Sequence, residues 1–421
     1  MAGLPPDGEP GPADGSLPES AFARLGAAPF GAAPFGAAPF GAAPFGIYVH
    51  VPFCQTRCGY CDFNTYTAAE LGSGASRATY AALAIGELRL AAKVLANRAG
   101  PVQTVFFGGG TPTLLPPADL AAILRAIDSE FGLSAAAEVT TEANPDTVDE
   151  RVLAELRSAG FTRISLGMQS AVPHVLAVLD RVHQPGRPEQ CVAWARSAGF
   201  GQVSLDLIYG TPGESDADWR TSLDRALSAG PDHMSAYALI VEDGTRLATR
   251  IRRGELVMPD DDVLADRYLI ADDRFEAAGL HWYEVSNWAA RDAARCRHNE
   301  LYWTGGNWWG IGPGAHSHVG GTRWWNVRHP VAYAQRVTAG LSPTQAREVL
   351  TDEDRATERI MLSTRLVSGC PVAYLSPAGL RAARTAADDG LASRAALELG
   401  AVRLTRRGRL LADAVIRNLT D

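Results

Sequence analysis

The chain alternates between short β-rich runs and helical stretches from about residue 47 to about residue 287, and this alternation constrains its fold more than any other feature. Strands are predicted at residues 46–51, 102–107, 137–142, 163–167, 202–208 and 233–240, with helices in most of the gaps. Such alternation is typical of a parallel α/β sheet, and its length suits a barrel or a partial barrel. Because these barrels carry their chemistry at the carboxyl ends of the strands, residues that follow the strands are the first candidates for a site.

Three cysteines, Cys54, Cys58 and Cys61, follow the first predicted strand within eight residues. Thiolates are the usual ligands of iron–sulfur clusters, and three of them leave one iron of a four-iron cluster open to a small molecule. A structural zinc site is an alternative, with His50 as a fourth ligand, but such sites usually draw their ligands from two separated pairs. A disulfide framework is disfavoured because three close thiols cannot pair off. The spacing therefore favours a cluster.

Polar or glycine-rich residues also follow most of the other predicted strands. In chain order they are Gly108, Gly109, Gly110 and Thr111, then Glu142, Gln169, Asp206, and Tyr237 with Ala238. Three glycines can form a tight turn, and they also let a ligand approach the backbone closely. They do not form a phosphate loop, which would end in Gly-Lys-Ser/Thr. A single polar side chain at a strand end is more often a loop cap, so the indication of a site comes from the set.

The spacing Cys54-x3-Cys58-x2-Cys61 resembles the signature of the radical S-adenosylmethionine (SAM) family. The run that leads into it is similar to the oxygen-independent coproporphyrinogen III oxidase branch: Tyr48-Val49-His50-Val51-Pro52-Phe53. The resemblance implies a partial (β/α)6 TIM-like barrel and a 4Fe-4S cluster on the three cysteines, with SAM bound beside it. Some SAM-contacting positions of this branch belong to a second SAM molecule, so whether this chain binds one or two SAM molecules remains open. These positions fall on Tyr48, Tyr60, Gly109, Gly110, Thr111, Glu142, Gln169, Arg181, Asp206 and Ala238, with Gly108 in the same glycine segment.

Seven of the nine tryptophans lie between residues 282 and 325. Rings gathered in this way can surround a flat aromatic ligand or form a core between domains, and composition does not decide between the two. Within this stretch, His298-Asn299-x-x-Tyr302-Trp303 resembles a motif of the HemW heme chaperones. That resemblance implies His298 as a heme ligand, because histidine is a common axial ligand of heme iron. The role of Cys296, two residues earlier, stays open.

Three regions are expected along the chain. Residues 1–46 contain Gly-Ala-Ala-Pro-Phe four times between residues 26 and 45, which predicts a disordered low-complexity tail. Residues 47–290 form the expected barrel, and residues 291–421 form a smaller C-terminal α+β domain that resembles a winged helix. A net charge of −8 argues against nucleic acid as a partner. Since no apolar run reaches the length of a membrane span and no secretory signal is evident, a cytoplasmic protein is expected.

The family chemistry is one-electron reduction of SAM by the cluster, which gives methionine and a 5′-deoxyadenosyl radical; an external donor such as a flavodoxin or ferredoxin supplies the electron. Two functions follow from the resemblance: a HemW-type chaperone that delivers heme to acceptor proteins, or a coproporphyrinogen III oxidase of porphyrin biosynthesis. The oxidase carries a fourth cysteine at the position of Phe63. This difference favours a chaperone that cleaves SAM reductively without being a coproporphyrinogen dehydrogenase, and no catalytic side chain is assigned. A plain interaction module with zinc would not explain the polar strand ends.

Overall fold

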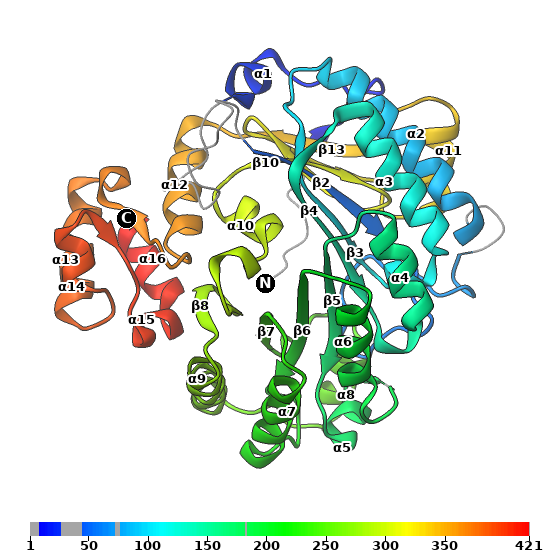
Figure 1. The fold of residues 1–421 in the computed structure, drawn as a ribbon. Coiled ribbons are helices and arrows are strands. Elements are labelled where there is room, and N and C mark those ends of the chain that lie inside the picture. Colours follow the sequence, from blue (N-terminus) through cyan, green and yellow to red (C-terminus); the bar gives the residue numbers. More distant parts are fainter. Residues whose placement is uncertain (1–7, 27–43, 72–75, 182, 421) are drawn as a thin grey trace.

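The computed structural model describes residues 8–26, 44–71, 76–181 and 183–420. All six predicted strands are present and pair in parallel in chain order, as Figure 1 shows. They are β2 (Phe45–Val51), β3 (Val102–Gly109), β4 (Leu133–Ala143), β5 (Arg163–Gln169), β6 (Gln202–Tyr209) and β7 (His233–Ala238). The order β2-β3-β4-β5-β6-β7 confirms the expected parallel α/β sheet.

Helices cover the outer side of this sheet (Figure 1). In chain order they are α2 (Arg77–Leu95), α3 (Pro117–Phe131), α4 (Glu150–Ser158), α6 (Arg187–Ser197) and α7 (Asp216–Ser228). Apolar residues at helical spacing form the buried side of α2, namely Tyr80, Ala84, Leu88, Ala91 and Leu95. They pack on strand residues that are buried throughout, such as Ile47 and Val49. Burial of each large apolar side chain contributes about 1.5–3 kcal/mol, so this layer is the main stabilising core.

The sheet continues beyond the six strands on both sides. β10 (Asn307–Ile311) pairs in parallel with β2, and antiparallel strands β11 (His316–Val319), β12 (Thr322–Asn326) and β13 (Thr344–Val349) extend that edge. β9 (Asn287–Ala289) and β8 (His281–Glu284) extend the other edge next to β7. In the described residues these strands therefore form one sheet with β2–β7. The domain boundary expected at residue 290 falls inside this continuous sheet.

Residues 8–26 are folded, which corrects the expectation of a disordered tail for this part of residues 1–46. β1 (Glu9–Pro10) pairs with β13, and α1 (Glu19–Leu25) buries Ala21 and Leu25. Asn307 Nδ2 donates a hydrogen bond to Leu25 O at 3.2 Å, which ties the helix to the sheet. The high glycine, alanine and proline content of the whole segment concealed this short amphipathic helix. Most of the Gly-Ala-Ala-Pro-Phe repeats lie outside the described residues.

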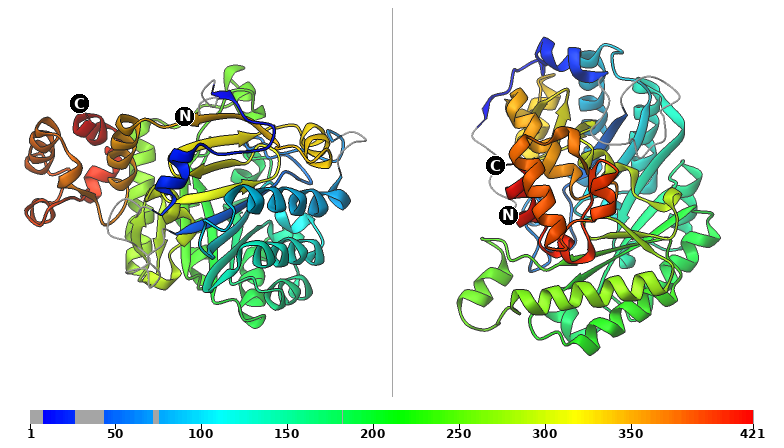
Figure 2. Two further views of the ribbon diagram at one scale, coloured as in Figure 1. Left: turned by 90° about the horizontal axis from the view of Figure 1, so that it is seen from above. Right: turned by 90° about the vertical axis from the view of Figure 1, so that its left-hand side faces the viewer.

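The C-terminal residues form a smaller unit with its own apolar cluster, which includes Ile360, Ala383, Val402 and Val415. Its helices are α12 (Asp352–Ser363), α13 (Pro377–Asp388), α14 (Arg394–Glu398), α15 (Arg406–Leu410) and α16 (Ala412–Thr420). A two-stranded sheet of β14 (Cys370–Pro371) and β15 (Ala401–Val402) completes the α+β unit. Figures 1 and 2 show it beside the main sheet.

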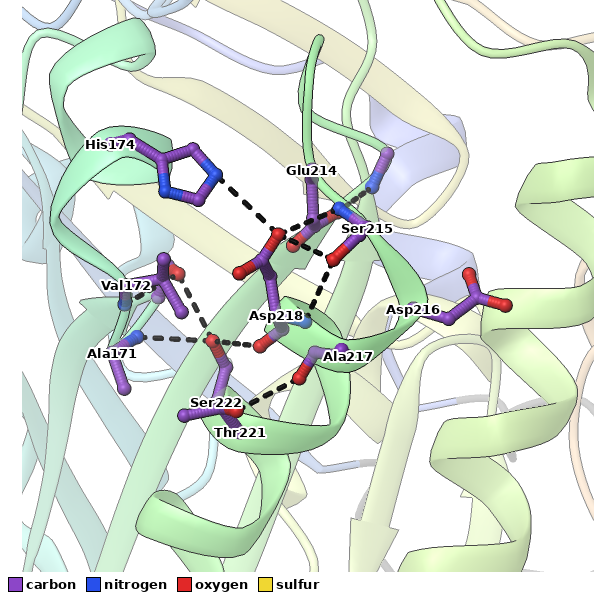
Figure 3. Close-up of polar contacts among 12 residues, drawn as sticks. Ala171, Val172, His174, Glu214, Ser215, Asp216, Ala217, Asp218, Thr221 and Ser222 are labelled. Carbon is purple, nitrogen blue, oxygen red and sulfur yellow. Dashed lines mark hydrogen bonds and ion pairs between the residues drawn. The ribbon is translucent and has the colours of Figure 1, made fainter.

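The N-terminus of α7 is fixed by side-chain hydrogen bonds, as Figure 3 shows. Asp218 N donates to Ser215 Oγ at 3.2 Å, and the Asp218 carboxylate accepts from the backbone of Ser215. The hydroxyl of Ser222 accepts from Ala171 N at 3.1 Å, which attaches α7 to the segment after β5. No helix among the residues described here is long and apolar enough to cross a membrane.

Candidate cofactor-binding cavity

A cavity of about 1500 Å³ lies at the carboxyl ends of the parallel strands. Twelve of the fifteen predicted site residues line it. They are Cys54, Cys58, Cys61, Tyr60, Gly109, Gly110, Thr111, Glu142, Gln169, Arg181, Asp206 and Ala238. Residues more than a hundred positions apart thus surround one space, because parallel strands end at the same edge of the sheet.

Backbone hydrogen bonds fix the loop that carries the cysteines. Cys54 N donates to Tyr66 O at 3.0 Å, which closes the loop at its base. On the far side, Gly59 N donates to Leu179 O at 3.1 Å, and Gly59 O accepts from Leu247 N at 2.8 Å. A Cβ at Gly59 would lie 2.4 Å from Asp180 Oδ2, so a larger residue here would have to displace that carboxylate. The three thiols are therefore held at the cavity by contacts from both sides.

The glycine segment packs directly against the strand that leads into the cysteines. Gly110 N donates to Val51 O at 2.8 Å and Thr111 N donates to Phe53 O at 2.7 Å. A Cβ at Gly110 would lie 2.5 Å from Phe53 O, and Gly109 has a φ of +105°. These positions exclude other residues because a side chain would separate the two segments.

Tyr48 and Gly108 lie behind the cavity wall rather than on it. The Tyr48 hydroxyl shares a hydrogen bond of 3.0 Å with His50 Nδ1. A Cβ at Gly108 would lie 3.0 Å from Glu142 Oε2, so this glycine leaves room for the carboxylate. In this structure both residues support the wall and do not line the cavity.

Two carboxyl groups, of Glu142 and Asp206, and the guanidinium group of Arg181 line the cavity. Burial raises the pKa of Glu142 to about 7, with repulsion from Asp206 as the second cause, and Glu142 Oε2 accepts from Gly109 N at 3.1 Å. Burial also raises the pKa of Asp206, whose carboxylate accepts from Ser165 Oγ at 2.8 Å. Arg181 Nη1 donates to Cys58 Sγ at 3.5 Å. A ligand that carries both an amine and a carboxylate would meet complementary groups here.

The three thiols are free and half-buried. Burial raises the pKa of Cys54, and it raises that of Cys61 to about 11. Ligation to metal must therefore displace their protons, as thiolate ligation generally does. Among the described residues, no three His, Cys, Asp or Glu side chains lie close enough together to hold a single metal ion. A four-iron cluster does not need such a group, because each thiolate binds a different iron. The soft donor set beside a large cavity fits such a cluster.

His298 is placed in the core by α10 (Arg297–Trp303) and does not line the cavity. Its Nδ1 shares a hydrogen bond of 2.8 Å with Thr104 Oγ1, and its Nε2 shares one of 2.8 Å with Tyr302 OH. The ring is 1% exposed, and burial lowers its pKa to about 3. To bind heme iron, His298 would have to give up one of these hydrogen bonds and leave the core. Two residues of the same segment, Cys296 and Asn299, do line the cavity.

Five of the seven tryptophans between residues 282 and 325 are buried, and the other two, Trp303 and Trp308, are half-buried. The rings of Trp309 and Trp324 meet edge to face with centroids 4.7 Å apart, and Trp288 Nε1 donates to Asp272 Oδ1 at 2.8 Å. None of the seven lines the cavity in the part of the chain that the structure describes. The structure thus favours the core interpretation of this cluster over a binding site built from tryptophan rings.

Comparison with known proteins agrees with this geometry. The sequence model of the Radical SAM superfamily matches residues 48–226. The heme chaperone HemW of Mycobacterium tuberculosis (strain ATCC 25618 / H37Rv) is 53% identical over 375 residues, which cover 89% of this chain and 94% of that protein. The heme chaperone HemW of Escherichia coli (strain K12) is 33% identical, with coverage of 79% and 86%. The chain belongs to the HemW family. The resemblance predicted from the cysteine spacing and from residues 298–303 is confirmed.

The fold of this HemW-family chain is also that of a solved structure. Coproporphyrinogen III oxidase (HemN) from Escherichia coli matches with a TM-score of 0.76 at 20% identity, over 97% of this chain and 94% of that chain. The predicted fold class is confirmed. Membership of the radical SAM superfamily implies a 4Fe-4S cluster and SAM as cofactors.

Sequence reasoning missed several residues on the inner wall of the HemW-family cavity. Ser165, Ser204 and Ser235 line it from three adjacent strands, together with Arg163 and His233. Ser165 lies opposite Ser204, and Asp206 lies opposite Ser235 in the strand register. A signal was available, because serine and arginine inside strands that are otherwise buried and apolar indicate a polar interior. The arginines that the C-terminal helices contribute to the cavity lie outside such strands, so this signal could not indicate them.

Proposed function

We propose that this chain is a heme chaperone that holds a 4Fe-4S cluster and SAM in the described cavity and passes heme to acceptor proteins. The observation that carries the proposal is the assembly of three cysteines, a glycine segment and two carboxyl groups around one cavity. The identity of 53% to a heme chaperone over 89% of the chain supports it. Phe63, at the position where the oxidase has a fourth cysteine, lines the same cavity.

Cys54, Cys58 and Cys61 would hold the cluster, and the iron that lacks a cysteine would be free to bind SAM. When bound, the cluster and SAM supply one-electron chemistry. Arg181 would stabilise the Cys58 thiolate, to which it already donates a hydrogen bond. Glu142 would accept hydrogen bonds from the amine or hydroxyl groups of SAM.

An external one-electron donor, such as a flavodoxin or ferredoxin, completes this proposal. The cysteine loop also lines a second hollow of about 550 Å³, where Cys58 and Cys61 are reached together with Arg57 and Arg246. Since this hollow meets the loop on a face lined by α8 (Arg246–Arg252) and by residues 67–70, a donor could approach the cluster there while SAM occupies the larger cavity.

The test is a comparison of hemin binding with coproporphyrinogen III turnover on one anaerobically reconstituted preparation. We expect a stoichiometric absorption band for bound heme, and no product when coproporphyrinogen III is supplied with SAM and a reductant. Protoporphyrinogen formation at enzymatic rates would overturn the proposal in favour of the oxidase. A colourless protein with one zinc and no iron or sulfide would eliminate both functions.

The same preparation tests His298. If His298 ligates heme, His298→Ala weakens the band, and His298→Ala supplied with free imidazole recovers it because imidazole can replace the missing axial ligand. A band of unchanged position and affinity in His298→Ala would remove this residue from the heme site.

A further inference from the structure

Exposed apolar side chains gather at the large cavity. Ten large apolar side chains of the described residues are exposed, and five of them line this one cavity. They are Phe63 (61% exposed), Tyr237 (42%), Ile240 (60%), Val285 (37%) and Leu411 (44%). Burial of the exposed part of each would be favourable, so a concentration of this kind marks a surface that a ligand covers.

These side chains come from parts of the chain that are far apart in sequence. Tyr237 and Ile240 lie at the end of β7, Val285 lies between β8 and β9, and Leu411 lies between α15 and α16. The apolar wall therefore extends from the main sheet to the C-terminal unit, and it runs across the mouth of the space in which SAM would lie.

The cavity is larger than one small molecule requires. Sites for single ligands of drug size occupy about 300–1000 Å³. The volume here is about 1500 Å³, so the cavity has room for a second molecule beside SAM.

Charge is divided unevenly around the mouth. The C-terminal unit contributes Arg407 and Arg417, which are exposed and line the cavity. Two further arginines of this side are already paired, Arg365 with Asp413 and Arg409 with Asp272. Acidic residues of the lining include Glu242 and the first turn of α9 (Asp261–Ala277) in the barrel, and Asp413 in the C-terminal unit, whose charge is paired with Arg365. A molecule with an apolar body and carboxylates at one edge would place those carboxylates toward the C-terminal unit.

We propose that heme binds at the mouth of this cavity, with its ring against Ile240, Val285 and Leu411 and its propionates toward Arg407 and Arg417. The inference rests on the proposed function, since it takes heme to be the cargo. Heme has the flat apolar body and the two carboxylates that this surface matches. Heme and SAM then share one cavity, and the barrel and the C-terminal unit each supply one side of the heme site.

Hemin titration of the full chain tests the location, followed by the absorption band and by quenching of tryptophan fluorescence. Ile240→Asp and Leu411→Asp place a charge on each side of the apolar wall, and each is expected to weaken binding by about ten-fold or more, equivalent to about 1.4 kcal/mol. Arg417→Glu is expected to weaken it by about five-fold through repulsion of the propionates. Val257→Asp and Leu399→Asp are matched controls, since these side chains are 80% and 90% exposed and lie outside the cavity lining.

Wild-type affinity in both Ile240→Asp and Leu411→Asp would overturn the location, as would loss of affinity in His298→Ala alone. Equal weakening in the two control variants would also overturn it, because hemin would then adhere to any exposed apolar surface. A wild-type chain that binds no hemin would refute the proposed function itself, and this result is distinct from a failure of the variants.

Discussion

At the scale of single residues, the cysteine loop gives the most direct prediction. Cys54→Ala removes one of three thiols that backbone hydrogen bonds hold at the cavity, so the cluster should not assemble. We expect iron and sulfide after anaerobic reconstitution to fall from about four per chain to near zero. Cys370→Ala is the control, because Cys370 is a buried free thiol of the C-terminal unit. Full iron content in Cys54→Ala would remove Cys54 from the ligand set.

Residue type and spacing predicted which strand-end residues meet, but not which side chain of a helix faces the cavity. Cys54, Glu142 and Asp206 could be predicted because parallel strands end at a common edge. His298 and Asn299 are neighbours on α10, and each successive helical residue points about 100° further around the axis. Thr104 and Tyr302 bind the His298 ring on the core side, and only the tertiary structure shows this.

At the scale of elements, the capping box of α7 gives a stability prediction. The Ser215 hydroxyl donates to Asp218 Oδ2 at 2.6 Å and accepts from Asp218 N. Ser215→Ala should lower the free energy of unfolding by about 1 kcal/mol, because the first turn then has an unsatisfied N–H group. The control is Ser228→Ala at the other end of the helix, whose hydroxyl donates only to Arg225 O. Urea unfolding measures both, and an equal loss in the two variants would contradict the capping role.

A buried carboxyl group on α2 gives a prediction about pH. Glu87 is 2% exposed and accepts hydrogen bonds from Gly312 N, Asn326 Nδ2 and Tyr333 OH, which attach α2 to the loop after β10 and to α11 (Pro330–Thr338). Burial raises its pKa from 4.5 to about 7. Because the pKa of Glu87 is higher in the folded chain than in the unfolded chain, its contribution to the free energy of unfolding is fully present below pH 4.5. This contribution is lost as the pH rises through 7.

Glu87→Gln should therefore gain stability relative to wild type by roughly 3 kcal/mol between pH 4.5 and pH 8. Urea unfolding midpoints across this range measure the difference, with Glu155→Gln on the exposed side of α4 as the control variant. A constant difference between Glu87→Gln and wild type at all pH values would show that the carboxyl group does not change its ionisation there.

Elements were easier to predict than their limits. The β-branched runs and their spacing predicted all six parallel strands, and the structure extends several of them by only a few residues. The helix α1 was missed because a stretch rich in glycine and proline surrounds its seven residues. Its stability depends on tertiary contacts with β10 and β11 rather than on local propensity.

At the scale of the whole molecule, the pairing of β10 with β2 could not be read from local pattern. The two strands are about 260 residues apart, and a strand carries no sequence code for its partner. The expected boundary at residue 290 followed a change of composition, whereas the sheet continues through that change. The separate core of the C-terminal unit begins only after residue 350.

One buried carboxylate is a main contact between this C-terminal unit and the barrel. Asp272 of α9 accepts from Arg409 Nη1 at 3.0 Å and Nη2 at 2.9 Å, from Trp288 Nε1 at 2.8 Å, and pairs with Arg406 at 2.9 Å. Its side chain is 3% exposed, so it cannot exchange a lost partner for bulk water. Arg409→Ala should therefore lower the free energy of unfolding of the C-terminal unit by about 2–3 kcal/mol. The loss is smaller than for a buried carboxylate left with no partner, because Arg406 and Trp288 still bind Asp272.

The loss should be local if the two cores are separate cooperative units. Hydrogen exchange followed by mass spectrometry should show residues 406–420 exchanging about ten-fold faster or more in Arg409→Ala, while β3, β4 and β5 keep their protection. Arg394→Ala is the control, because its ion pair with Asp388 is exposed and lies within the C-terminal unit. A uniform loss of protection would mean that the barrel and the C-terminal unit unfold together. Heme affinity should fall with the local opening, since the proposed heme site includes Leu411 and Arg417 of the C-terminal unit.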